Sequence, residues 1–203
     1  MDPKELTFSA WQRLYRLPSE FPGFRARVTV RVGGDLYQGL CEVDGFTPRS
    51  QLPEPVRKKV DGELYSILKH RKTSDFWQGD GRHRMEIIGE GPEGLCVQVD
   101  DGGPSRLWIK DGRYTLVERN HGKIRFRLHF RQYQALAGDR LLPSQVVLVE
   151  RGITGSIQKV KLIQDTYQEV GPYWLPKERF SLTEVGDGME SIWISLEEVI
   201  LRA

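Results

Sequence analysis

Residues 89–94 match a ligand-binding motif by the spacing of their glycines. Their sequence, Gly-Glu-Gly-Pro-Glu-Gly, follows the order G-x-G-x-x-G of dinucleotide-binding loops. Such loops bind phosphate because free backbone amides open into the N-terminus of a helix. Here Pro92 has no amide hydrogen, Glu90 and Glu93 would repel phosphate, and a strand-like run follows at 95–99. We therefore interpret these residues as a hairpin turn and expect no nucleotide cofactor.

Histidines and carboxylates are the residue types that most often supply metal ligands and general bases. The four histidines are at no metal-ligand spacing from one another or from a cysteine: His70, His83, His121 and His129. Six aspartates fall at predicted turns or strand ends, where Asp is favoured because it bonds the backbone: Asp80, Asp100, Asp101, Asp111, Asp165 and Asp187. We predict no metal site, no catalytic residue and a non-enzymatic protein. An unfamiliar site assembled by folding is the alternative.

Large aromatic side chains gather in the part of the chain that is rich in turns. The candidates for ligand binding are Phe76, Trp77, Trp108, Tyr173, Trp174 and Trp193. One interpretation is that they fill a core or a sheet face. The other is that they line a concave apolar surface, part of which is open to a ligand. Tyr173 and Trp174 are consecutive, so they cannot both point inward from one strand.

Two segments, residues 24–32 and 123–131, alternate strictly between apolar and other residues. This period of two predicts half-buried antiparallel strands with an apolar face and a largely basic face. The basic residues are Arg25, Arg27 and Arg31 in the first segment, and Lys123, Arg125, Arg127, His129 and Arg131 in the second. Glutamates on adjacent strands, such as Glu42 and Glu150, could neutralise them. Otherwise they form a surface for an acidic protein or an anionic membrane.

Two helices and many strands must position these side chains. Asp2 and Pro3 predict the start of a first helix that continues to about Leu17. A second helix is indicated by an apolar stripe: Val56, Val60, Leu64, Ile67 and Leu68. After Thr73, turn signals about ten residues apart indicate an antiparallel meander. We predict a single domain over residues 1–203, of α+β class and mainly β. It would be a curved antiparallel sheet or half-open barrel of about nine to twelve strands, with two helices on its concave side.

Composition limits the classes of partner and compartment. The chain has 203 residues, of which 38% are hydrophobic and 29% charged, and its formal net charge is +2. This small charge argues against a nucleic-acid partner. We expect a cytoplasmic protein, because the sequence shows no signal peptide and no apolar run near the ~18 residues of a membrane span. Cys41 and Cys96 are expected to be buried reduced thiols.

Four segments together resemble one known family. They are Phe21-Pro22-Gly23-Phe24, Tyr37-Gln38-Gly39, His70-Arg71-Lys72, and residues 164–176, whose sequence begins Gln-Asp-Thr-Tyr-Gln-Glu-Val-Gly. The chain resembles, over nearly its whole length, an uncharacterised family of cyanobacteria and chloroplasts, a domain of unknown function. The resemblance implies a photosynthetic host, and it supplies no catalytic residues to carry over to this chain.

The order of elements is also similar to the periplasmic lipoprotein-carrier fold. The shared features are an N-terminal helix, an alternating strand from Phe24, a helix over the sheet and a late strand after Leu175-Pro176. In that fold a curved, incompletely closed sheet shelters acyl chains under helices. The resemblance implies a binding or carrier protein for a hydrophobic ligand, lipid or pigment-like, between sheet and helices. The alternative is an assembly factor that docks its partner through the basic strand faces.

Overall fold

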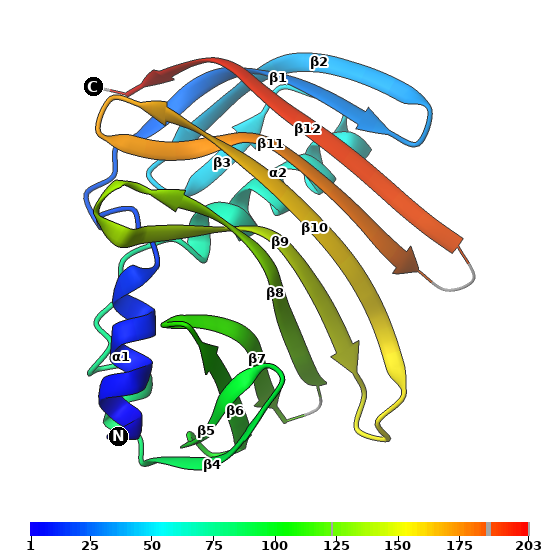
Figure 1. The fold of residues 1–203 in the computed structure, drawn as a ribbon. Helices are drawn as coiled ribbons and strands as arrows, with labels where there is room; N and C mark the ends of the chain where they lie inside the picture. Colours follow the sequence, from blue (N-terminus) through cyan, green and yellow to red (C-terminus); the bar gives the residue numbers. More distant parts are fainter. Residues whose placement is uncertain (123, 186–187, 203) are drawn as a thin grey trace. The chain divides into compact units, whose positions relative to one another are not determined.

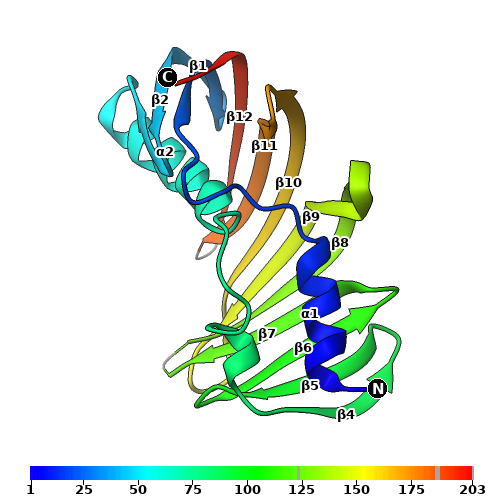
Figure 2. The same cartoon turned by 90° about the vertical axis from the view of Figure 1, so that its left-hand side faces the viewer.

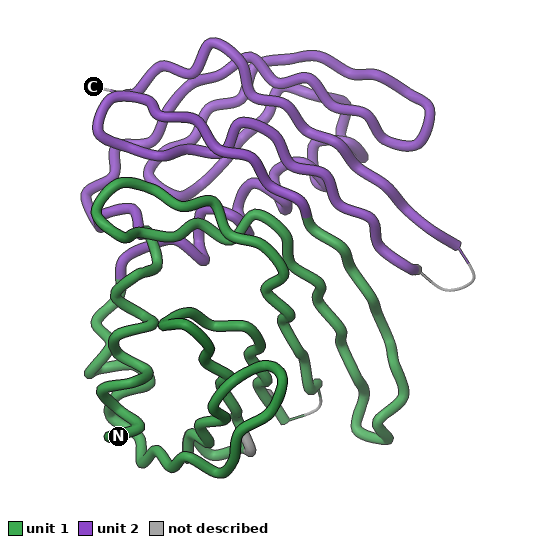
Figure 3. Tube along the Cα trace, viewed as in Figure 1, with its two compact units in different colours: residues 1–15, 74–163 green, residues 16–73, 164–203 purple. Residues whose placement is uncertain are grey.

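The computed structural model describes residues 1–122, 124–185 and 188–202 and divides the chain into two compact units (Figure 3). Unit 1 comprises residues 1–15 and 74–163, and unit 2 comprises residues 16–73 and 164–203. Each unit is therefore assembled from two separate stretches of sequence. The single domain expected from the sequence stays a prediction.

The described residues of unit 1 form one α-helix, two short 3-10 helices, the strands β4 to β9 and the first half of β10. Its elements are α1 (Pro3–Arg13), η1 (Asp80–Arg82), β4 (Met85–Gly91), β5 (Gly94–Asp100), β6 (Pro104–Lys110), β7 (Arg113–His121), β8 (Ile124–Leu136), η2 (Ala137–Asp139), β9 (Arg140–Arg151) and the first half of β10 (Ile157–Val170). Unit 2 contains β1 (Gly23–Val32), β2 (Asp35–Asp44), β3 (Thr47–Ser50), α2 (Glu54–Lys69), the rest of β10, β11 (Tyr173–Val185) and β12 (Gly188–Leu201).

The strands of the described chain form one open antiparallel sheet (Figure 1). Its order is β3-β2-β1-β12-β11-β10-β9-β8-β7-β6-β5-β4, a twelve-stranded sheet. Strands consecutive in the chain are neighbours except β3 and β4, which form the two edges, and the first and last strands, β1 and β12, pair with each other. This arrangement confirms a mainly β fold with two α-helices. The G-x-G-x-x-G segment is the hairpin between β4 and β5, as its chemistry predicted.

Helix α1 covers the apolar side of strands in unit 1 (Figure 2). It begins as predicted, because the Asp2 carboxylate accepts a hydrogen bond from the Lys4 amide at 2.9 Å. The expected end near Leu17 was too late. Leu14 leaves the helix in an extended conformation and pairs with Leu141 of β9, while the Tyr15 amide donates to the Leu141 carbonyl at 2.9 Å.

Helix α2 is the second helix that the apolar stripe predicted, and all five stripe residues are buried. In the same unit, the alternating strand β1 buries Phe24, Ala26, Val28 and Val30, so each element hides its apolar side. Among the described residues, neither helix is long and apolar enough to cross a lipid bilayer.

Replacing Leu64 by Ala should destabilise unit 2. The side chain is fully buried in the α2 stripe, so its loss leaves a cavity and should lower the free energy of unfolding by about 2–5 kcal/mol. Urea denaturation measures this. The control is Arg57→Ala on the exposed side of α2, which should change the free energy by no more than about 0.5 kcal/mol. Equal effects of the two substitutions would contradict the assigned helix face.

The Cys41 thiol should be unreactive in the folded protein. It is fully buried in β2, and burial, with Asp61 and Glu42 nearby, raises its pKa to about 12. Since an unfolded thiol ionises near pH ~8.5, stability should fall as pH rises above that value. In the Cys96→Ala background, iodoacetamide should modify Cys41 only when urea unfolds the protein. Rapid modification without urea would contradict the buried placement.

Candidate functional site

A row of three side chains crosses neighbouring strands of unit 2. Arg31 of β1 lies opposite Trp193 of β12, and Trp193 lies opposite Phe180 of β11. Their sequence neighbours Val30 and Ile192 are buried on the other face, together with α2. The row therefore lies on the face of these strands that α2 does not cover. With Ser191, the three side chains line a pocket of about 330 Å³.

The pocket combines an exposed cation with two half-buried aromatic rings. Arg31 is exposed and makes no ion pair with any described residue. Trp193 and Phe180 are partly covered by the sheet and partly open. Leu36 of β2, opposite Arg31 and 56% exposed, extends the apolar surface beside the guanidinium. A guanidinium beside open aromatic rings can bind a ligand that has both an anionic group and an apolar body.

The other two predicted basic residues of unit 2 are paired. Arg25 lies 3.2 Å from the Glu42 carboxylate, one of the two glutamates expected to neutralise the basic faces. Arg27 contacts both Glu197 and Glu198, at 3.3 Å and 2.8 Å. Arg31 is thus the member of this set that keeps its charge available within the described part of unit 2.

In unit 1, two of the described arginines of β8 form ion pairs and a third does not. Arg127 pairs with the buried Glu118, and Arg131 lies 3.5 Å from Glu93. Arg125 is exposed and makes no ion pair among the described residues. Burial lowers the pKa of His129, and nearby Arg131 lowers it further. Lys123 lies outside the described residues.

The six aromatic candidates are divided between the units. In unit 1, Phe76 is buried among aromatic rings of α1, and its ring centre lies 5.1 Å from that of Trp77, which is half exposed. Trp108 lies on β6 opposite Cys96. The unit 2 members are Tyr173, Trp174 and Trp193. Tyr173 packs edge-on against Phe21 at 5.1 Å, and Trp174 is half-buried. Among the six, Trp193 is the one that lines a described pocket.

Unit 2 also contains a buried pair of charges on its other face. The Arg179 Nε and Nη2 atoms donate to the two Asp165 carboxylate oxygens at 2.7 Å and 2.8 Å. Both side chains are almost completely buried. This two-point geometry is the strongest common form of an ion pair, because both guanidinium edges and both oxygens are used. It joins β10 to β11.

The pair is extended on both sides by further polar groups. Arg179 Nη1 donates to the Glu63 carbonyl at 2.9 Å and lies 3.2 Å from the Glu63 carboxylate, which links α2 to the sheet. On the other side, Tyr167 donates to Asp165 at 3.3 Å. The Arg71 guanidinium stacks on the Tyr167 ring at 4.0 Å and donates to the Tyr167 hydroxyl. We call these five residues (Glu63, Arg71, Asp165, Tyr167 and Arg179) the buried charge network.

Burial and charge act differently on the members of this network. Burial lowers the pKa of Arg71, although Tyr167 and Asp165 oppose the shift. Burial also lowers the pKa of Arg179, but Asp165 and Glu63 together outweigh it and raise that pKa above its ordinary value. Burial raises the pKa of Tyr167. Arg179 is therefore held firmly in its charged form, and Tyr167 in its neutral form.

A family model described as "Protein of unknown function (DUF3386)" matches residues 1–196. The chain belongs to the DUF3386 family. This confirms the resemblance to a family of unknown function. No curated protein and no solved structure matches the chain. The likeness of this DUF3386 protein to lipoprotein carriers, and its distribution among cyanobacteria and chloroplasts, stay predictions.

Sequence reasoning missed the buried charge network of the DUF3386 protein. Asp165 was expected at a turn or strand end, but it lies inside β10 with its side chain buried. Its signal was present in the Asp-Thr-Tyr segment, which places a carboxylate and a phenol on one strand face. Arg71 follows the end of α2 within the His70-Arg71-Lys72 segment, and nothing in that segment indicated a buried charge. For Arg179 and Phe180 the alternation in β11 gave no distinctive signal.

Asp165→Asn should strongly destabilise unit 2. The substitution leaves the Arg179 guanidinium buried without its two-point partner, and breaking a buried pair from one side costs about 3–5 kcal/mol. The comparison is Glu42→Gln, which breaks the exposed pair with Arg25 and should cost at most about 1 kcal/mol. Chemical denaturation of both variants decides. A loss below 1 kcal/mol for Asp165→Asn would contradict the structural role of the network.

Proposed function

We propose that this DUF3386 protein is a non-enzymatic binding or carrier protein for an amphipathic ligand. The observation that supports it most is the convergence of Arg31, Trp193 and Phe180 on one pocket. An aromatic residue and a basic residue, each identified from the sequence for a separate reason, are adjacent there. The ligand would place its anionic group at Arg31 and its apolar body on the two rings.

The dimensions and chemistry of the pocket suit this class of ligand. A volume of about 330 Å³ lies at the lower end of the ~300–1,000 Å³ typical of small-molecule sites. The Arg31 side chain has five donors and no competing carboxylate among the described residues. We place the ligand among lipids and pigment-like molecules, in the cytoplasm of a photosynthetic host.

The proposal includes the shape expected from the sequence, a curved sheet or half-open barrel with both helices on its concave side. Its support is that each unit pairs one helix with the apolar side of its own strands. The sequence placed the ligand between sheet and helices, whereas the Arg31 pocket lies on the uncovered side of the unit 2 strands. Binding on the helix side stays a separate prediction.

The alternative is an assembly factor that docks an acidic protein or an anionic membrane surface. Arg31 and Arg125 favour it, since both are exposed and lack an ion pair within the described chain. Four other members of the predicted basic surface, Arg25, Arg27, Arg127 and Arg131, contact glutamates. This neutralisation leaves the small-molecule proposal better supported than the docking surface.

The test uses a pair of naphthalene dyes, anilinonaphthalene sulfonate and its uncharged relative phenylnaphthylamine. Both should bind, with energy transfer from Trp193. Arg31→Gln should weaken the sulfonate dye about five- to tenfold, the usual effect of losing one charge-assisted hydrogen bond at a partly open site, and leave the neutral dye unchanged. Trp193→Ala should weaken both dyes.

The matched control is Arg125→Gln, which removes another exposed arginine of the predicted basic surface without an ion pair among the described residues, and it should leave both dyes unaffected. Equal loss of the sulfonate dye in the Arg31 and Arg125 variants would contradict a local site. Unchanged affinity of both dyes in the Trp193→Ala variant would also contradict it. Thermal unfolding of each variant shows whether it is folded.

A further inference from the structure

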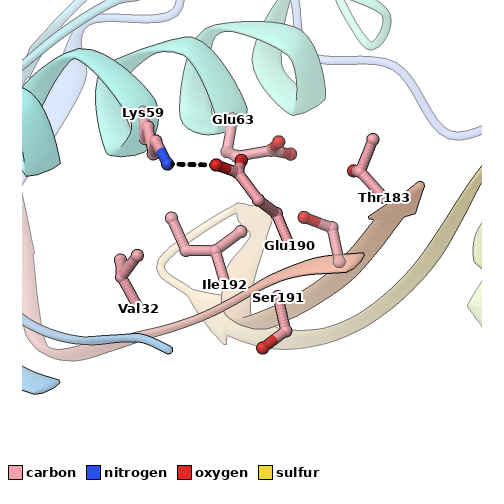
Figure 4. Close-up of a pocket in the computed structure, with 8 residues that line it drawn as sticks. Val32, Lys59, Glu63, Thr183, Glu190, Ser191 and Ile192 are labelled. Carbon is pink, nitrogen blue, oxygen red and sulfur yellow. Dashed lines mark hydrogen bonds and ion pairs between the residues drawn. The ribbon is translucent and has the colours of Figure 1, made fainter. Parts of the chain in front are cut away.

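Unit 2 has a second pocket, on the α2 side of the strands and distinct from the Arg31 pocket. Its volume is about 110 Å³, which is room for several waters or a group of a few heavy atoms (Figure 4). Most of its lining is polar and comes from α2, β11 and β12: Val32, Lys59, Glu63, Ser181, Thr183, Glu190, Ser191 and Ile192.

One carboxylate at this pocket, that of Glu190, has a weakly held partner. Glu63 and Glu190 both line the pocket, but their carboxylates have different partners: Glu190 pairs with the Lys59 ammonium, and Glu63 pairs with Arg179 (Figure 4). The Lys59 Nζ atom lies 2.9 Å from the Glu190 carboxylate, and the two side chains are 44% and 59% exposed. An exposed pair of this kind is weak and exchanges readily with other ions. Lys59 therefore occupies a place that an external ammonium group can also take.

The inner side of the pocket is fixed and contains an unused polar group. Ser181 is only 1% exposed and lines the pocket, and none of the hydrogen bonds among the described residues involves its hydroxyl. Glu63 is held by Arg179 at 3.2 Å, and Arg179 is held by Asp165. A hydroxyl that lines the pocket without a partner in the described chain can accept a hydrogen bond from a bound group.

We propose that this pocket binds the primary ammonium group of a small molecule. Glu190 supplies the negative charge, and the hydroxyls of Ser181 and Thr183 accept hydrogen bonds. Val32 and Ile192 contact the short alkyl chain. Lys59 is a built-in competitor that occupies Glu190 when no ligand is bound. Ser191 lines both pockets, but the inference does not depend on the Arg31 pocket, because the groups that would bind the ammonium belong to other residues.

The probe is propylammonium chloride, followed by NMR chemical shifts of the isotope-labelled full chain at constant ionic strength. The wild type should bind it weakly, with shifts at residues of the pocket. Lys59→Met should tighten binding at least threefold, because the competitor is gone. Glu190→Gln in the Lys59→Met background should weaken binding at least tenfold. Propanol, which has the same chain without the charge, should bind more weakly by a similar factor.

The control on the same helix is Lys58→Met. Lys58 pairs with Glu54 at 2.9 Å, is not part of the pocket lining, and its loss should not change propylammonium binding. Three results would overturn the proposal: no binding to the Lys59→Met variant, equal binding of propanol, or tightening by Lys58→Met as large as that by Lys59→Met. Lys59→Gln, which keeps a polar side chain, replaces Lys59→Met if the latter does not fold.

Discussion

The alternation of side chains along β1 determines which residues of this strand are buried and which lie on its opposite face. Phe24, Val28 and Val30 must be removed from water, and in unit 2 they are buried together with the stripe of α2. The same alternation places Arg25, Arg27 and Arg31 on the other face whatever lies there. Burial of the apolar face of β1 therefore fixes the position of its arginines on the opposite face.

The neighbours of each arginine then decide its role. Arg25 and Arg27 meet glutamates and become ordinary surface pairs of small energetic value. Arg31 meets Trp193, with Phe180 one strand further on, and no carboxylate among the described residues. The register of β12 and β11 against β1 therefore determines which arginines are neutralised and which one lies beside aromatic rings in a pocket. Register is a property of strand pairing, not of any one strand.

The α2 side of unit 2 contains charged side chains that are buried. Asp165, Arg179 and Arg71 are buried ions, and such groups are tolerated only when the geometry of their partners is good. The two-point contact of Asp165 with Arg179 and the link to Glu63 meet this condition and attach α2 to the sheet. The carboxylate of Glu63 is thereby fixed at the edge of the second pocket.

Much of the local structure could be predicted from the sequence, because it depends on short-range periodicity. The α2 stripe, the β1 alternation and the hairpin at 89–94 are all of this kind. What could not be predicted depends on contacts distant in sequence. Arg179 meets Asp165 and Glu63, and Phe180 meets Trp193, only after β10, β11 and β12 have paired and α2 has packed. The end of α1 was placed too late for the same reason, since pairing of Leu14 with Leu141 ends the helix.

Native mass spectrometry of the protein purified from its own host shows whether the protein binds an amphipathic small molecule. We expect a population heavier than the bare chain by the mass of an anionic amphiphile, which organic solvent releases. Arg31→Gln purified in the same way should lose most of that population. Only the bare mass, or a complex with an acidic protein in place of a small molecule, would contradict it.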